Sequence, residues 1–156
     1  MITNACSQTT VSETDESSVV GIFVASTPCG EIARPLHQIP AEADCERIQW
    51  KLILYQDPNT LAPTTYQLNS TYGLTEQGAP GFMRGGTQVE IQGKWILVKG
   101  TNTNPEAVVY QLDPDDPQIS LSFLKVDDNL LHLLYRDERL MIGNAAWSYT
   151  LSRTDH

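Results

Sequence analysis

After Ser18, apolar side chains recur at every second position, and this spacing constrains the fold more than any other feature. In the clearest segment, single intervening residues separate four apolar ones: Ile48, Trp50, Leu52 and Leu54. A period of two is that of a β-strand, whose successive side chains point to opposite faces, whereas a helix needs a period of 3.6. The chain is therefore expected to form strands that each bury one face.

Turn-forming residues separate eight or nine such segments, which predicts an antiparallel all-β domain. The expected strands are 20–24, 48–55, 66–72, 89–98, 107–112, 119–126, 130–135, 140–142 and 147–153. Within the fourth of these, Gly93-Lys94 is interpreted as a hairpin-like break. Two long loops remain: 30–44, in which Pro35 and Pro40 interrupt any helix, and 73–86.

Closing these strands into a small up-and-down β-barrel would remove exposed sheet edges. The interior would then be formed by ten residues: Ile48, Trp50, Leu52, Leu54, Tyr66, Leu68, Leu121, Phe123, Leu131 and Leu133. An eight-stranded barrel has an interior that is either filled by side chains or wide enough for one small ligand. The sequence is compatible with both.

The charge balance argues against several functions. Among 156 residues, 10 are Lys or Arg and 19 are Asp or Glu, for a formal net charge of −9. Such an acidic chain repels nucleic acid and anionic lipid, and it has no apolar run long enough for a membrane-spanning helix. No nucleophile motif such as Gly-x-Ser-x-Gly is present, so we expect a protein that is not an enzyme.

The first 18 residues read as a tether preceding a barrel domain at 19–156. Residues 7–18 are polar and acidic with a single apolar residue, Val11, and cannot bury enough surface to order themselves. Just before them, the small residue Ala5 precedes Cys6, as at the cleavage end of a bacterial lipoprotein signal. Under this interpretation Cys6 is lipidated and the sequence begins just upstream of it; an incidental cysteine in a disordered terminus is the alternative.

Several segments, in order along the chain, resemble the N-terminal domain of the NlpE-type copper-resistance lipoproteins. In that family a Pro-Cys-Ala-Asp-Cys-x-x-Ile segment joins the first strand to the second, and here Pro28-Cys29 and the run 43–48 match its two parts. The other matching segments are 49–55, 65–68 with Tyr72, 93–95, 109–112, 128–134 and 148–151. The resemblance covers roughly Val19 to Arg153.

The resemblance implies a lipocalin-like barrel on a bacterial outer-membrane lipoprotein, associated with copper tolerance, surface sensing and envelope-stress signalling. One departure matters. The family's two cysteines are separated by two residues, whereas fifteen lie between Cys29 and Cys45. A Cys-x-x-Cys metal chelate therefore does not carry over to this chain.

The cysteines permit three interpretations. If Cys6 is acylated, Cys29 and Cys45 remain to form a disulfide, as is common in exported proteins. Alternatively Cys29, His37 and Cys45 ligate copper, because thiolates select Cu(I), with Met83 and Met141 as further soft donors. The third possibility is a pair of free, partly buried thiols.

These features predict a non-catalytic binding or sensing module, attached to the membrane only through a lipid and presenting its loops to an envelope protein. A lipocalin-like carrier of a small apolar ligand is the main alternative. A second alternative is an inhibitor that inserts a stapled loop into a protease or lysozyme.

Overall fold

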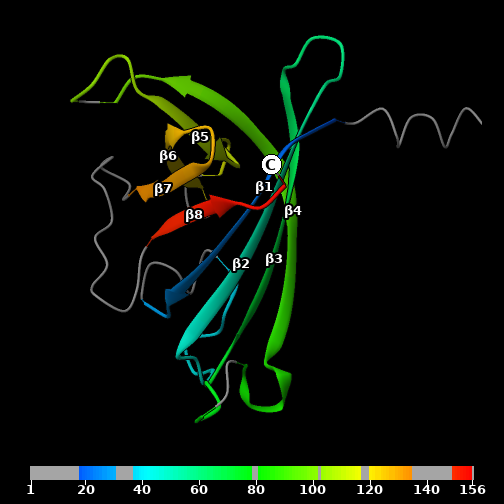
Figure 1. Cartoon of the computed structure of the whole chain (residues 1–156), viewed down its shortest axis with the longest axis vertical. Coiled ribbons are helices and arrows are strands. Elements are labelled where there is room, and N and C mark those ends of the chain that lie inside the picture. The colour runs from blue at the N-terminus through cyan, green and yellow to red at the C-terminus, as the bar shows by residue number, and fades with distance from the viewer. Residues whose placement is uncertain are drawn as a thin grey trace, which may run out of the picture.

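The computed structural model describes residues 18–30, 37–78, 81–101, 103–116, 120–134 and 149–155, and the statements below concern these ranges (Figure 1). They contain eight strands and one short 3₁₀ helix: β1 (Ser18–Pro28), β2 (Arg47–Gln56), β3 (Pro63–Gly73), η1 (Met83–Gly85), β4 (Thr87–Lys99), β5 (Val108–Leu112), β6 (Leu121–Asp127), β7 (Leu130–Leu134) and β8 (Thr150–Arg153). None of the described helical residues forms a segment long and apolar enough to cross a membrane.

Each strand pairs antiparallel with its neighbour in sequence, and β8 returns to β1, so the sheet is a closed up-and-down barrel. The predicted all-β fold class is confirmed, including the long connection between the first two strands. The closing contact is short, with Phe23 opposite Arg153 and Val24 opposite Ser152. The C-terminal residues extend it, because the Arg153 guanidinium donates to the Val20 carbonyl at 2.9 Å and the Thr154 amide to the Ile22 carbonyl at 2.8 Å.

The strands fall into two groups of unequal length. β1 to β4 have 10 to 13 residues each, whereas β5 to β8 have four to seven. The short strands lie beside one end of the long sheet (Figure 1). β4 accordingly pairs with β3 over residues 87–94 and with β5 over residues 95–99. No strand of the described residues lies across from the other end of the long sheet (Figure 1).

All ten residues predicted to face the interior are buried. Leu52 and Phe123 have no exposed surface, and Trp50 retains only 2%. Trp50 meets Phe123 edge to face, with ring centroids 6.3 Å apart. Aromatic pairs favour this geometry, and the alternation seen in the sequence therefore encodes a filled core.

The predicted break at Gly93-Lys94 is wrong, because β4 runs continuously from Thr87 to Lys99. The glycine is required for a different reason. A Cβ on Gly93 would collide with the carboxylate of Asp113 and the ring of Tyr66, whose hydroxyl donates to Asp113. Glycine here permits a close approach of side chains across the strand rather than a turn.

Two other expectations differ from the structure or fall outside it. The loop 73–86, expected to be irregular, contains a bridge between Thr75 and Phe82 followed by η1. The guanidinium of Arg47 lies 4.5 Å from the centre of the Phe82 ring, which fixes this loop against the start of β2. The expected strand 140–142 and the beginning of 147–153 lie outside the described residues.

Replacing Gly93 by alanine should destabilise the barrel, because the added methyl meets Asp113 and Tyr66. We expect a loss of about 1–3 kcal/mol in the free energy of unfolding, measured by urea denaturation. Gly81→Ala serves as the control, since a Cβ there meets nothing within 4 Å. In the double variant Gly93→Ala/Asp113→Ala the clash with the Asp113 carboxylate should be relieved, while the contact with the Tyr66 ring remains; equal stability of wild type and Gly93→Ala would contradict this account of β4.

Candidate functional site

The described part of the loop between β1 and β2, residues 37–45, inserts side chains into the core. His37 is completely buried and Ile39 is 5% exposed, whereas Gln38 and Pro40 between and beyond them point to solvent. Ile39 belongs to the same apolar cluster as Trp50. We call residues 37–45 the plug segment, because it covers core side chains at the end of the long sheet where β1 ends and β2 begins.

A cysteine pair joins the two ends of this connection. Cys29 follows β1 directly, Cys45 lies two residues before β2, and the two stand at disulfide-bonding distance with Cα atoms 5.9 Å apart. Both are partly buried against the core. The structure thus brings together the two cysteines that the disulfide interpretation pairs, at the two ends of the loop that carries His37.

His37 occupies an apolar site with a single polar partner. Its Nδ1 lies 2.5 Å from Oγ of the buried Ser70. The imidazole packs edge-on against Trp50, with ring centroids 4.0 Å apart. Its Nε2 is buried without a hydrogen-bond partner among the described residues. Burial lowers the pKa of His37 from 6.5 to about 3, so the ring is neutral at physiological pH.

The sequence did not predict the two hydroxyl groups that form hydrogen bonds with His37 and with Trp50 beside it. Ser70 faces His37, and Thr27 accepts a hydrogen bond of 2.8 Å from Nε1 of Trp50. Both hydroxyl residues are buried. A signal was present for Ser70, which occupies an inward position in the alternation 66, 68, 70, 72 where a serine is otherwise unfavourable.

The residues do not fit a copper site in this arrangement. The sulfur atoms of Cys29 and Cys45 face each other rather than a shared ligand position, and Nδ1 of His37 is engaged by Ser70. Within the described ranges, no three His, Cys, Asp or Glu residues are grouped so as to hold a metal ion. Met83 is exposed at 49%, while Met141 and the lipidation candidate Cys6 lie outside the described residues.

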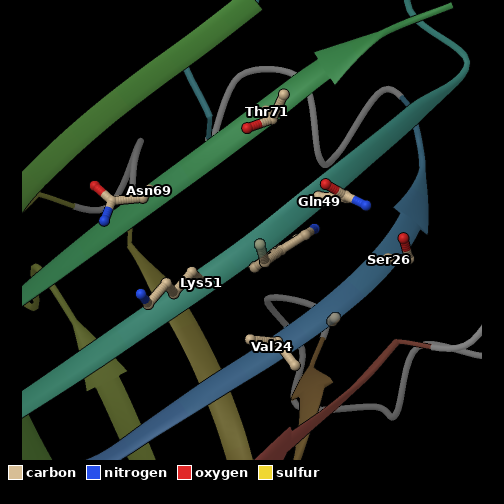
Figure 2. Close-up of a pocket in the computed structure, with 8 residues that line it drawn as sticks. Val24, Ser26, Gln49, Lys51, Asn69 and Thr71 are labelled. Carbon is tan, nitrogen blue, oxygen red and sulfur yellow. The ribbon is translucent and has the colours of Figure 1, made fainter. Parts of the chain in front are cut away.

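The other candidate site is a shallow groove on the outer face of the long sheet. One hollow of about 590 Å³ crosses β1, β2 and β3. Figure 2 shows side chains from these three strands lining it: Val24, Ser26, Gln49, Lys51, Asn69 and Thr71. A second hollow of about 530 Å³ continues from Asn69 and Thr71 onto β4. The first hollow combines apolar surface with the polar side chains of Ser26, Gln49 and Lys51, whereas amide and hydroxyl groups predominate in the second.

Comparison with known proteins adds no relative. No family model, no curated protein and no solved structure matches the chain. The NlpE-type resemblance therefore stays a prediction from the sequence.

The burial of neutral His37 predicts acid-sensitive stability. Because the folded-state pKa of about 3 lies below the unfolded value of 6.5, the unfolded chain binds the extra proton between these values, and stability falls as the pH drops through this window. Between pH 6.5 and about pH 5, where most carboxylates stay ionised, the burial of His37 should lower the free energy of unfolding by about 1.5 kcal/mol. His37→Leu should remove that slope in urea titrations. His132→Gln, on the outer face, should retain it; identical slopes for wild type and His37→Leu would contradict the assignment.

The disulfide should contribute to stability and prevent copper binding at this pair. Isolated protein should gain the mass of two hydrogens on reduction, and Cys29→Ser/Cys45→Ser should lower the free energy of unfolding by about 3 kcal/mol, as expected for a loop of this length. Cu(I) titration against a competing chelator should detect no uptake by the oxidised protein. Uptake that disappears in the double variant would instead support the copper interpretation of Cys29, His37 and Cys45.

Proposed function

We propose that this chain is a bacterial envelope lipoprotein of the NlpE type, attached to the membrane through Cys6, whose barrel is a non-catalytic binding or sensing module. Its role would lie in copper tolerance and envelope-stress signalling. The support from the sequence is the ordered series of resembling segments and the small residue, cysteine and polar tether at the N-terminus.

The observation that carries the proposal is the filled interior. A barrel that carries a small molecule leaves accessible surface on the side chains that line its cavity. Here the central side chains, among them Leu52, Leu54, Phe123 and Leu133, retain at most 1%. A role as carrier of an apolar ligand at the barrel centre is therefore disfavoured, and a role through the outer surface is favoured.

The outer surface has features suited to recognition. The plug segment is held at one end by Cys45 and inserted at His37 and Ile39, so its exposed residues Gln38 and Pro40 are presented from a constrained backbone. A preorganised surface loses less conformational entropy on binding than a flexible loop does. The groove of Figure 2, which has a mixed apolar and polar lining, adjoins this end of the sheet through Ser26 and Gln49.

Under this proposal the link to copper does not pass through ligation by the oxidised cysteine pair, since the sulfurs are bonded to each other. The protein would instead take part by contacting an envelope protein. A tether of about a dozen residues would give the barrel freedom to reach such a partner while the lipid keeps it near the membrane.

The proposal is tested by deletion and complementation in the native host. Loss of the protein should reduce growth in copper and change the activity of an envelope-stress reporter. Wild type expressed behind a bacterial lipoprotein signal peptide should restore both and incorporate labelled palmitate. Cys6→Ala should lose the label and the membrane fractionation, and should fail to complement. A deletion strain with unchanged copper tolerance and unchanged stress response would refute the proposed function.

A further inference from the structure

The difference in strand length leaves part of β4 with a neighbour on one side only. Residues 87–94 pair with β3, but the pairing with β5 begins at Trp95. Gln88, Glu90 and Gln92 are exposed, and within the described chain no strand pairs with their outer side. Figure 1 shows the first part of β4 along the border of the long sheet, away from the end where β5 to β8 gather.

The hydrogen-bonding pattern identifies the backbone groups at this border. The backbone carbonyl of Lys94 accepts a hydrogen bond from the Asp113 amide at 2.8 Å, so the backbone groups of Lys94 point away from β3. Along a strand, the backbone N–H and C=O groups of successive residues point alternately to its two sides. The backbone groups of Gln92, Glu90 and Gln88 therefore point away from β3, as those of Lys94 do. The intervening residues Val89, Ile91 and Gly93 direct their backbone groups toward β3, with which this part of β4 pairs. Among the described residues, the backbone N–H and C=O groups of Gln88, Glu90 and Gln92 therefore have no strand partner, and we call these three residues the β4 edge.

The side chains along this edge alternate in polarity. Val89 and Ile91 point inward, pack against the core cluster and are only partly buried. Gln88, Glu90 and Gln92 point outward, and Nε2 of Gln92 donates to Oε2 of Glu90 at 3.0 Å. An additional strand placed here would cover the inner pair with its own apolar residues and would place one side chain opposite Glu90.

The opposite border of the long sheet is protected. Beyond the short pairing with β8, β1 continues only from Ala25 to Pro28, and the proline has no N–H to offer. Proline at an edge is a common device against unwanted strand pairing. β4 contains no proline, so the two borders differ in their capacity to accept another strand.

We propose that the β4 edge binds an extended segment of a partner protein, in which a Lys or Arg opposite Glu90 is flanked on both sides by apolar residues. Strand addition of this kind is an established mode of peptide recognition. The inference deepens the proposed binding function by naming the surface and the chemistry of the partner.

Charge argues for a foreign segment over a second copy. The Lys94 carbonyl already accepts a hydrogen bond from Asp113, so it is not available to a second copy of the chain. If two copies paired their β4 edges in antiparallel fashion over all three residues, the pairing would be centred on Glu90. Glu90 would then face its own copy, and like charges directly opposite are destabilising. The net charge of −9 adds to this repulsion and favours a basic segment.

The test follows amide hydrogen exchange by NMR on the full chain. The probe is the capped peptide Thr-Thr-Val-Lys-Val-Thr-Thr. Without it, the amides of Gln88, Glu90 and Gln92 should exchange fast and those of Val89 and Ile91 slowly. At about millimolar peptide, the three edge amides should exchange at least about tenfold more slowly. Backbone N-methylation at the peptide's Lys should abolish this protection, whereas N-methylation at a Val, which faces away from β4, should preserve it.

Two protein variants separate edge pairing from general charge attraction. The Glu90→Lys variant should no longer bind the peptide with Lys at its centre and should instead bind the peptide in which Glu replaces that Lys. Glu106→Lys, which makes the same charge change at an exposed residue beyond β4, should behave as wild type. Absence of protection at the three amides, or protection insensitive to N-methylation, would overturn the proposal. So would protection without peptide that grows with protein concentration, since this indicates self-pairing. These readouts depend on neither Cys6 nor copper, so failure here and failure of the proposed function can be told apart.

Discussion

The packing of Trp50 connects the separate parts of this small barrel. Its ring meets Phe123 of β6 across the interior and His37 of the plug segment on another side, and its Nε1 is bonded to Thr27 of β1. An indole supplies a large apolar surface together with one donor that must be satisfied when it is buried. The burial of Thr27, Ser70 and His37 in an otherwise apolar core follows from this arrangement, because each lies against Trp50 or against a residue that contacts it.

A second constraint is the unequal length of the two halves of the sheet. Four short strands close only part of the circumference of four long ones, so the long sheet extends past the closed region. The plug segment, which carries His37 and Ile39, covers the inner face of this extension near β2 and β3. At the border formed by β4, no described strand covers the sheet, and backbone N–H and C=O groups there remain available for hydrogen bonding. The same mismatch thus accounts for both the inserted loop and the unpaired edge.

Under the proposed binding function, the outer surface and the border of the long sheet are the candidate contact surfaces. Among the described residues the central side chains have almost no accessible surface, which disfavours a carrier, and the two cysteine sulfurs stand at disulfide-bonding distance from each other. The described residues also form a groove of mixed polarity over β1 to β3, a constrained loop and an exposed strand edge. The proposed binding function would use one or more of these surfaces.

The sequence by itself determined the strand class, the approximate limits of most strands and all ten interior residues that it predicted, because alternation with a period of two directly reflects which side chains leave water. Cysteine number also indicated the pairing of Cys29 with Cys45. Only the tertiary structure decided the role of Gly93, which a local pattern reads as a break and which a distant Asp113 requires. The same holds for His37, because its burial against Trp50 and Ser70 depends on residues remote in sequence. Burial of apolar faces is encoded locally, whereas close approaches, polar partners and unpaired edges arise from how segments far apart meet in space.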